Sequence, residues 1–338
     1  LTGSSMEFRR QSRAVLLQGN VHALQTTREL SAENLLMELD TSFHARRLVA
    51  SGHPQLRDTD VDGPASLDAD TISAEIRPDG SVDSIVAAGS VHGSRVTPAG
   101  EDQIEAGRVQ MDLATRKNVP RMLTAGVGVV LTSRGVTPAG GTRRVESDAI
   151  EMHFTDDSRG DSASGPVRME SVSTLAPARA EWQNVSMSGG KPTPQTMRMR
   201  GRQMNLKFDG QNQLQQLTGS GGLEVTRQLG DGPEQITSSR ELTAKFAGAG
   251  EWSTIDQNGD VRFREGPRSG QGERAHLDRA ANTAALTGSV VIADGATRTT
   301  AQSATFTQGL NELRADGNVL TTELHGGAGS LSNFAQEP

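Results

Sequence analysis

The chain has 338 residues, a net charge of −7, no cysteine, and aromatic residues at only 3% of positions. The negative charge and the scattered arginines argue against nucleic-acid binding, and the lack of cysteine excludes disulfides and thiolate metal sites. No run of about 18 apolar residues, the length that a membrane-spanning helix needs, occurs in the chain.

A two-part repeat runs along the sequence. In each unit a short strand of alternating apolar residues is followed by a glycine that opens a second strand, as residues 72–76 lead to Gly89-Ser90-Val91. Because such a unit buries its apolar face only against its neighbours, the repeat predicts an elongated stack. The alternating strands begin, in chain order, near residues 6, 35, 72, 109, 150, 204, 242, 277 and 306.

The two halves of the repeat predict two apolar walls. We assign the alternating strand to one wall and the Gly-x-Val strand to the other. The pairs Asp209-Gly210, Asn258-Gly259 and Asp316-Gly317 predict hairpin turns, because glycine supplies the positive φ that tight turns require. The segment Gly126-Val127-Gly128-Val129-Val130 leaves open which valines face inward.

The pattern divides the chain into four segments. Repeats fill 1–154, and they resume over 200–325 in what we interpret as the same stack. Between them, 155–199 is predicted to be an irregular, loop-rich insertion, and 326–338 is predicted to be a flexible tail. Residues 31–39 have the spacing of a short capped helix, but their alternating equivalents favour a strand, and 274–285 carries the same ambiguity.

No constellation typical of catalysis or metal binding is present. The seven histidines form no pair with ligand spacing. Asp256-Gln257-Asn258-Gly259-Asp260 resembles the start of a calcium loop but lacks the later ligands, so we interpret it as a hairpin turn. The cluster Gly219–Gly222 lacks the lysine of a phosphate-binding loop, which favours a bulge or a strand start. We therefore expect a protein that is not an enzyme and holds no cofactor or metal.

Two segments of the chain resemble a known family: Gln18-Gly19-Asn20-Val21 and Ala315-Asp316-Gly317-Asn318-Val319. These segments resemble the A-x-G-x-V strand of the OstA-like family of lipopolysaccharide-transport proteins, which includes LptA, LptC and the N-terminal domain of LptD. The small residue and alternating apolars of Ser147-Asp148-Ala149-Ile150-Glu151-Met152 are similar to the other half-repeat of that family. The similarity extends across nearly the whole chain, but the length and the interruption at 155–199 leave the family member open.

The resemblance implies an all-β fold, an elongated antiparallel β-jelly roll shaped like a half-open V. About eight or nine two-strand repeats and roughly sixteen to eighteen strands are expected. It implies a carrier or bridge for lipopolysaccharide transport to the outer membrane, with lipid A acyl chains shielded in an apolar slot. The residues expected to line that slot are Val15, Leu17, Val21, Leu35, Met37, Leu39, Ile72, Ile76, Ile85, Val91, Val109, Met111, Leu113, Ile150, Met152, Phe154, Met204, Leu206, Phe208, Leu242, Phe246, Val261, Leu286, Val290, Phe306 and Val319.

The same resemblance implies a periplasmic location and partners that are other jelly-roll transport proteins, joined edge to edge by strand addition. Because the chain starts at Leu1 inside a repeat, we interpret it as a fragment or mature form whose N-terminal part, the place of a signal or membrane anchor, has been removed. Alternating aliphatic residues more often form an ordinary core, so a structural or adhesive β-solenoid without a ligand is the alternative. A glycan-active β-sandwich enzyme is a second and weaker alternative.

Overall fold

The computed structural model describes residues 1–25, 27–59, 63–97, 100–114, 119–136, 141–156, 167–188, 191–211, 213–247, 251–307 and 312–323. All regular secondary structure in these ranges is β-strand, and none of it is a helix that could cross a membrane. The strands are β1 (Ser5–Arg9), β2 (Ala14–Gln25), β3 (Arg28–Leu39), β4 (Ala45–Ser51), β5 (Gln55–Asp58), β6 (Ala65–Asp68), β7 (Thr71–Ile76), β8 (Val82–Thr97), β9 (Gly100–Leu113), β10 (Pro120–Gly135), β11 (Thr142–Asp156), β12 (Val167–Thr174), β13 (Ala178–Ser188), β14 (Lys191–Gly201), β15 (Gln203–Phe208), β16 (Leu214–Leu229), β17 (Gln235–Ala247), β18 (Glu251–Glu265), β19 (Arg268–Asp278), β20 (Thr283–Asp294), β21 (Thr297–Thr307), β22 (Glu312–Asp316) and β23 (Leu320–Glu323).

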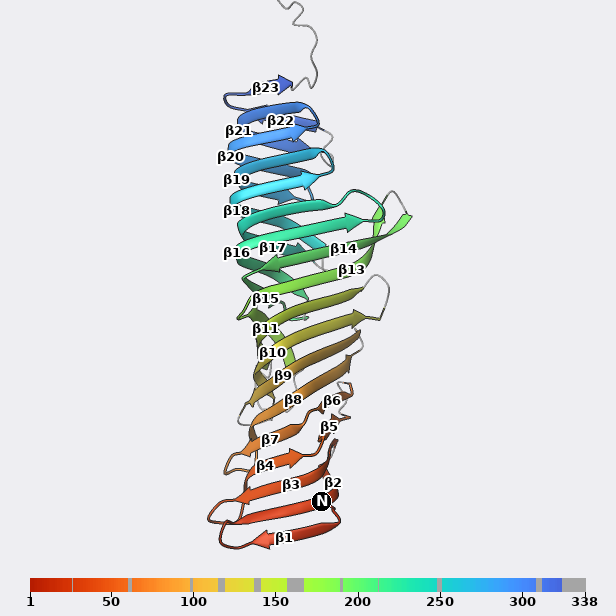
Figure 1. Cartoon of the computed structure of the whole chain (residues 1–338), viewed down its shortest axis with the longest axis vertical. Helices are drawn as coiled ribbons and strands as arrows, with labels where there is room; N and C mark the ends of the chain where they lie inside the picture. Colours follow the sequence, from red (N-terminus) through yellow and green to blue (C-terminus); the bar gives the residue numbers. More distant parts are fainter. Residues whose placement is uncertain are drawn as a thin grey trace, which may run out of the picture.

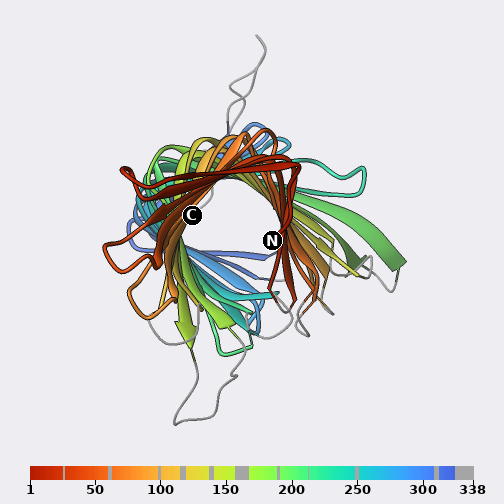
Figure 2. The ribbon, with the colours of Figure 1, turned by 90° about the horizontal axis from the view of Figure 1, so that it is seen from below.

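The strands form a single antiparallel stack with β1 at one end and β23 at the other (Figure 1). Every pairing between neighbours is antiparallel, for example β8 with β9 and β9 with β10. Seen along the long axis, the strands lie over one another around a common centre (Figure 2). The fold is thus all-β, elongated and antiparallel, as the sequence predicts. Residues 31–39 and both arms of 274–285 are strand as well.

A corner interrupts each long strand near its middle. In β18, Gly259 and Asp260 have φ angles of 76° and 49°, and the pairing register with β17 shifts between Asn258 and Val261. Two residues with positive φ opposite one residue of the neighbouring strand form a bulge, which bends the chain. The same pair of positive φ values occurs at Gly19-Asn20, Gly52-His53, Gly89-Ser90, Val127-Gly128, Gly221-Gly222, Gly288-Ser289 and Gly317-Asn318.

The corner corrects two sequence predictions. Asn258-Gly259 is not a hairpin turn, because it lies within β18. Asp316-Gly317 is not one either, because β22 and β23 on its two sides both pair with β21 and not with each other. The walls are also divided differently: each long strand crosses the corner and contributes one half to each wall. We call the halves that contain Leu35, Ile72 and Val109 the first wall, and the halves that contain Val21, Val91 and Val129 the second wall. The short strands β4, β7, β12, β15 and β22 lie in the first wall, and β5, β6, β13, β14 and β23 lie in the second.

Large and small residues alternate along the innermost row of the first wall. In register, Ala50 faces Ile72, Ile72 faces Ala87, and Ala87 faces Val109. Because a large side chain has a small neighbour on each adjacent strand, the residues of this row fit the strand spacing without crowding. The largest buried cluster joins this row to the second wall, since it contains Ile72 and Val109 together with Val91. The core therefore lies where the two walls meet at the corner.

The segment 155–199, which we expected to be irregular, contains strands wherever the structure describes it. β11 pairs with β12 in the first wall and with β13 in the second, and β16 pairs with β15 and β14 in the same two walls. Here the rung is built from four short strands in place of two long ones. This is one reason why the described part of the chain has 23 strands, more than the repeat count suggests. Pro192 and Pro194 in β14 hide the strand from sequence inspection, because proline is rare inside sheets.

The structure shows which of Val127 and Val129 faces inward, a question that the sequence left open. The side chain of Val127 is 74% exposed, whereas Val129 is 1% exposed and faces inward. Val127 also has a φ of 68°, a conformation that is strained for a β-branched residue. It occupies the corner position that glycine holds in most other rungs.

Replacing Val127 with glycine should therefore stabilise the protein. Relief of left-handed strain is worth about 1–2 kcal/mol, and the greater flexibility of glycine in the unfolded chain offsets about 0.4–1 kcal/mol of that. Urea denaturation should show a net gain of about 0.5 kcal/mol. Val96→Gly, at an exposed position in β8 with negative φ, should instead lower stability, and a loss with Val127→Gly would contradict the strain argument.

Candidate functional site

On most rungs the burial of the inner face of the first wall falls with distance from the corner, whereas Leu113, Leu123 and Met152 stay buried away from it. In β15, Met204 lies next to the corner and is fully buried, whereas Leu206 and Phe208 on the same face are half-buried. The same decrease occurs from Leu242 to Phe246 in β17. Such a gradient is that of a wedge: the walls touch at the corner and separate toward a mouth.

The structure places 25 of the 26 predicted slot residues on these inner faces, in two classes, and leaves one outside. The fully buried ones are Leu17, Val21, Leu35, Ile72, Val91, Val109, Leu113, Ile150, Met152, Met204, Leu242, Val261, Leu286 and Val290. The half-buried ones are Val15, Met37, Leu39, Ile76, Ile85, Met111, Phe154, Leu206, Phe208, Phe246 and Phe306. Val319 is 49% exposed and joins no described cluster, because it follows the corner of the last rung.

Several inner residues escaped the sequence analysis. Val129 and Leu223 each stand directly after a corner pair and are almost completely buried. The signal was present, because Gly221-Gly222-Leu223 keeps the spacing of Gly-x-Val. Met199 of β14 was missed since it lies in the segment predicted to be irregular. The alanines of the innermost row were missed because small residues give no apolar alternation.

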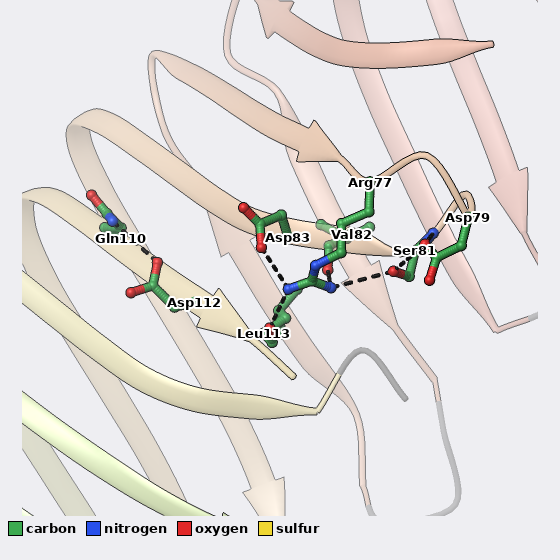
Figure 3. A network of polar contacts seen from close by, with 8 residues as sticks. All are labelled: Arg77, Asp79, Ser81, Val82, Asp83, Gln110, Asp112 and Leu113. Carbon is green, nitrogen blue, oxygen red and sulfur yellow. Dashed lines mark hydrogen bonds and ion pairs between the residues drawn. The ribbon is translucent and has the colours of Figure 1, made fainter. Parts of the chain in front are cut away.

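Arg77 ties together three strands at the rim of the first wall (Figure 3). Its guanidinium donates to the carbonyl oxygens of Val82 and Leu113, at 2.7 Å and 2.6 Å. It also donates to the carboxylate of Asp83 at 2.5 Å. Arg77 follows β7, whereas these acceptors belong to β8 and β9. The contacts therefore hold the ends of the three strands together at the edge of the mouth.

The adjacent turn contains a carboxylate with a shifted pKa. The Ser81 hydroxyl donates to Asp79 at 2.6 Å, and this hydrogen bond, followed by one from the Ser81 backbone N–H, lowers the pKa of Asp79. Bonds to the charged form stabilise it, so Asp79 should favour the folded state above its unfolded pKa. That contribution is lost as pH falls through the lowered folded pKa.

An NMR titration of the Asp79 carboxyl carbon measures this shift. We expect a midpoint below the ordinary range of about 3.9 for aspartate, and a rise toward it in Ser81→Ala. Asp83 is not bonded to Ser81 and supplies an internal comparison within the same spectra. An unchanged Asp79 midpoint in Ser81→Ala would contradict the assigned cause.

Charged residues also stand at the rim of the second wall. Arg28 pairs with Asp58 at 2.9 Å, and Arg227 and Glu265 occupy equivalent positions, the third inner residue from the corner, on later rungs. Both rims therefore combine charged side chains with apolar ones, since Arg77 and Asp83 stand at the rim of the first wall.

Two cavities lie at the surface of the described residues. A depression of about 600 Å³ at the corner is lined by His53, Pro54, Gln55, Asp68, Ala69, Asp70, Ser90 and His92. A second of about 370 Å³ lies over the charged strands β11, β13, β14 and β16, beside three arginine–glutamate pairs. Neither is lined by the half-buried first-wall residues, and no group of acidic residues and histidines in the described part of the chain has the arrangement of a metal site.

Comparisons with known proteins give a likeness in structure and no match in sequence. No protein-family model matches the chain, and no curated protein matches it. Among solved structures, the chain is similar to LptH, the LptA homologous periplasmic component of the conserved lipopolysaccharide transport device from Pseudomonas aeruginosa. The likeness has 12% sequence identity and a TM-score of 0.30, and it covers 50% of this chain and 90% of LptH.

Proposed function

We propose that this protein is a periplasmic carrier or bridge for lipopolysaccharide, with the acyl chains held between the two walls and the sugar and phosphate groups outside. The observation that carries the proposal is the gradient of burial, which leaves a band of half-buried apolar residues along the first wall, interrupted where Leu113, Leu123 and Met152 are buried. The band contains Met37, Leu39, Ile76, Met111, Phe154, Leu206, Phe208, Phe246 and Phe306.

The energetics of such a band suit a carrier. Each methylene removed from water contributes about 0.8 kcal/mol, so partial shielding of several chains supplies affinity without any specific polar contact. Methionine side chains such as Met37 and Met111 adapt their shape to irregular ligands.

The ends of the stack suit the second part of the proposal, a bridge built by strand addition. Among the described strands β1 pairs with β2 alone, and it is exposed along its whole length, with Met6 and Phe8 among its side chains. At the opposite end, β23 pairs with β21 and exposes Leu320. Unpaired edges with apolar side chains accept strands from another jelly-roll protein.

The alternative is a structural or adhesive β-solenoid with a filled core. The completely buried innermost row, with Leu35 and Ile150 at 1% exposure or less, favours that reading near the corner. The two functions differ at the second inner residue from the corner on each strand, such as Met111 or Leu206. A filled solenoid would keep these side chains inaccessible, whereas a carrier would place them against its ligand.

Photocrosslinking separates the two. A benzoyl-phenylalanine introduced at Met111 or Leu206 should crosslink to lipopolysaccharide on irradiation. The same group at Gln110 or Asn205, the preceding residues on the outer face of the same strands, is the matched control. Crosslinking no stronger from the inner positions than from these controls would contradict the proposal and favour the solenoid.

A further inference from the structure

A row of side chains runs along the rim of the second wall, formed by the third inner residue from the corner on successive strands. The register joins each member to the next, as Arg28 faces Asp58 and Arg227 faces Gln235. An arginine recurs in this row at every third strand, which places neighbouring arginines about 14 Å apart at the usual strand spacing. These arginines are Arg28, Arg95, Arg143, Arg227 and Arg268.

The first and the last arginine of the row have carboxylate partners. Arg28 pairs with Asp58 at 2.9 Å, and Arg268 pairs with Asp294 at 3.2 Å. Each carboxylate lies on the next strand in the same row. The charge of these two arginines is therefore compensated within the wall.

The middle of the row contains two arginines and no carboxylate. Neither Arg143 nor Arg227 forms an ion pair within the described ranges, and the Nε atom of Arg227 is buried without a hydrogen bond. Glu265, two strands from Arg227, accepts a hydrogen bond of 2.7 Å from the Gln235 side chain. Between Asp102 and Glu265 the members of the row are Ser133, Arg143, Trp182, Met197, Arg227 and Gln235.

The apolar band of the first wall meets the same strands across the wedge. Val145 and Val225 precede the two arginines on the inner faces of β11 and β16, and both pack against the buried cluster around Met204. Leu206 and Phe246 of the band pack against that cluster from the first wall. A molecule with its acyl chains on this part of the band would therefore bring its headgroup to the two arginines.

Phosphate is the anion that suits such arginines. A guanidinium group binds a phosphate through two parallel N–H···O bonds. Because Arg143 and Arg227 lie about 14 Å apart along the row, each would hold a separate phosphate. We propose that these two arginines select an amphiphile whose headgroup carries two phosphates, one at each end. The inference rests on the proposed function for the acyl chains and adds a requirement on the headgroup.

Lipid A with both phosphates, compared with its monophosphoryl form, tests this selection. The wild-type protein should bind the form with two phosphates about tenfold more tightly, as expected for one more charge-assisted contact. Arg143→Gln and Arg227→Gln should each abolish the preference, because one arginine then remains for one phosphate. Arg144→Gln is the matched control and should keep it, since Arg144 is the next residue of β11, faces outward and pairs with Glu146 at 2.8 Å.

Two results would overturn the selection. One is equal binding of the two lipids by the wild type, and the other is a preference that persists in either glutamine variant. Arg143 is exposed, so its replacement should leave the fold intact, and circular dichroism verifies this for both variants.

The phosphorylated disaccharide of lipid A without its acyl chains separates this inference from the carrier function. Calorimetric titration should show that the wild type binds this disaccharide more tightly than either glutamine variant does. If neither lipid binds but the disaccharide shows this difference, the carrier function fails and the arginine pair stands. If both lipids bind equally well and the disaccharide shows no difference, the carrier function stands and the arginine pair fails.

Discussion

Replacing Ile150 with alanine is expected to lower the free energy of unfolding by about 3–4 kcal/mol. Ile150 has no exposed surface and lies at the centre of the largest cluster, where residues of both walls pack together. Its neighbours in register are Ala125 and Thr174. These side chains are too short to fill the space that the substitution leaves, so the cavity should persist and add to the lost burial.

Urea denaturation followed by circular dichroism measures this loss. Leu175→Ala is the matched control, because this substitution removes a similar apolar volume from a residue that is 57% exposed. Its effect should stay within about 0.5 kcal/mol. Hydrogen exchange should further show that the destabilisation is strongest in β10, β11 and β12, since a stack transmits strain mainly between neighbouring rungs. Equal losses for the two variants would show that the core does not lie at the corner.

The alternation of large and small residues should appear as strong coupling between Ile72 and Ala87. Ile72→Ala should cost about 2–4 kcal/mol through a cavity, and Ala87→Ile about 1–3 kcal/mol through overpacking. Because the two residues face each other on β7 and β8, the double substitution exchanges their volumes. Its cost should fall below the sum of the single effects by at least about 1 kcal/mol.

The pair Ile72→Ala and Leu242→Ala provides the comparison for this cycle. Leu242 belongs to a different buried cluster, so the two losses should add to within about 0.5 kcal/mol. Additive effects for Ile72 and Ala87 would mean that the row does not interdigitate. The alternation would then be a feature of the sequence without a role in packing.

The inner face of each strand was readable from the sequence because its signal is local. Alternation in residues 204–208 identifies Met204, Leu206 and Phe208 as one face, and the structure keeps all three together. The pairing partners were partly readable as well, since the repeat implies that each unit packs on the next. Val319 shows the limit of this reading. It obeys the local pattern, but it is 49% exposed at the end of the stack.

The corner was the feature that the local sequence pattern predicted wrongly. Asn258-Gly259 has the composition of a tight turn, and a short sequence does not reveal whether two positive φ values reverse a strand or only bend it. The outcome depends on the facing strand: β17 pairs with β18 on both sides of the bulge, so the chain continues. The same contacts across strands made β12, β13 and β14 regular despite the polar residues and prolines of this segment.

The sequence by itself determined an all-β stack with one apolar face per strand, because both properties follow from residue alternation and from the spacing of the repeats. Only the tertiary structure decided that each long strand belongs to two walls and that on most rungs the inner residues change from buried to half-buried with distance from the corner. Those properties depend on where the strands bend and on which residues meet across the wedge. Such contacts join residues far apart in the chain, and no local pattern records them.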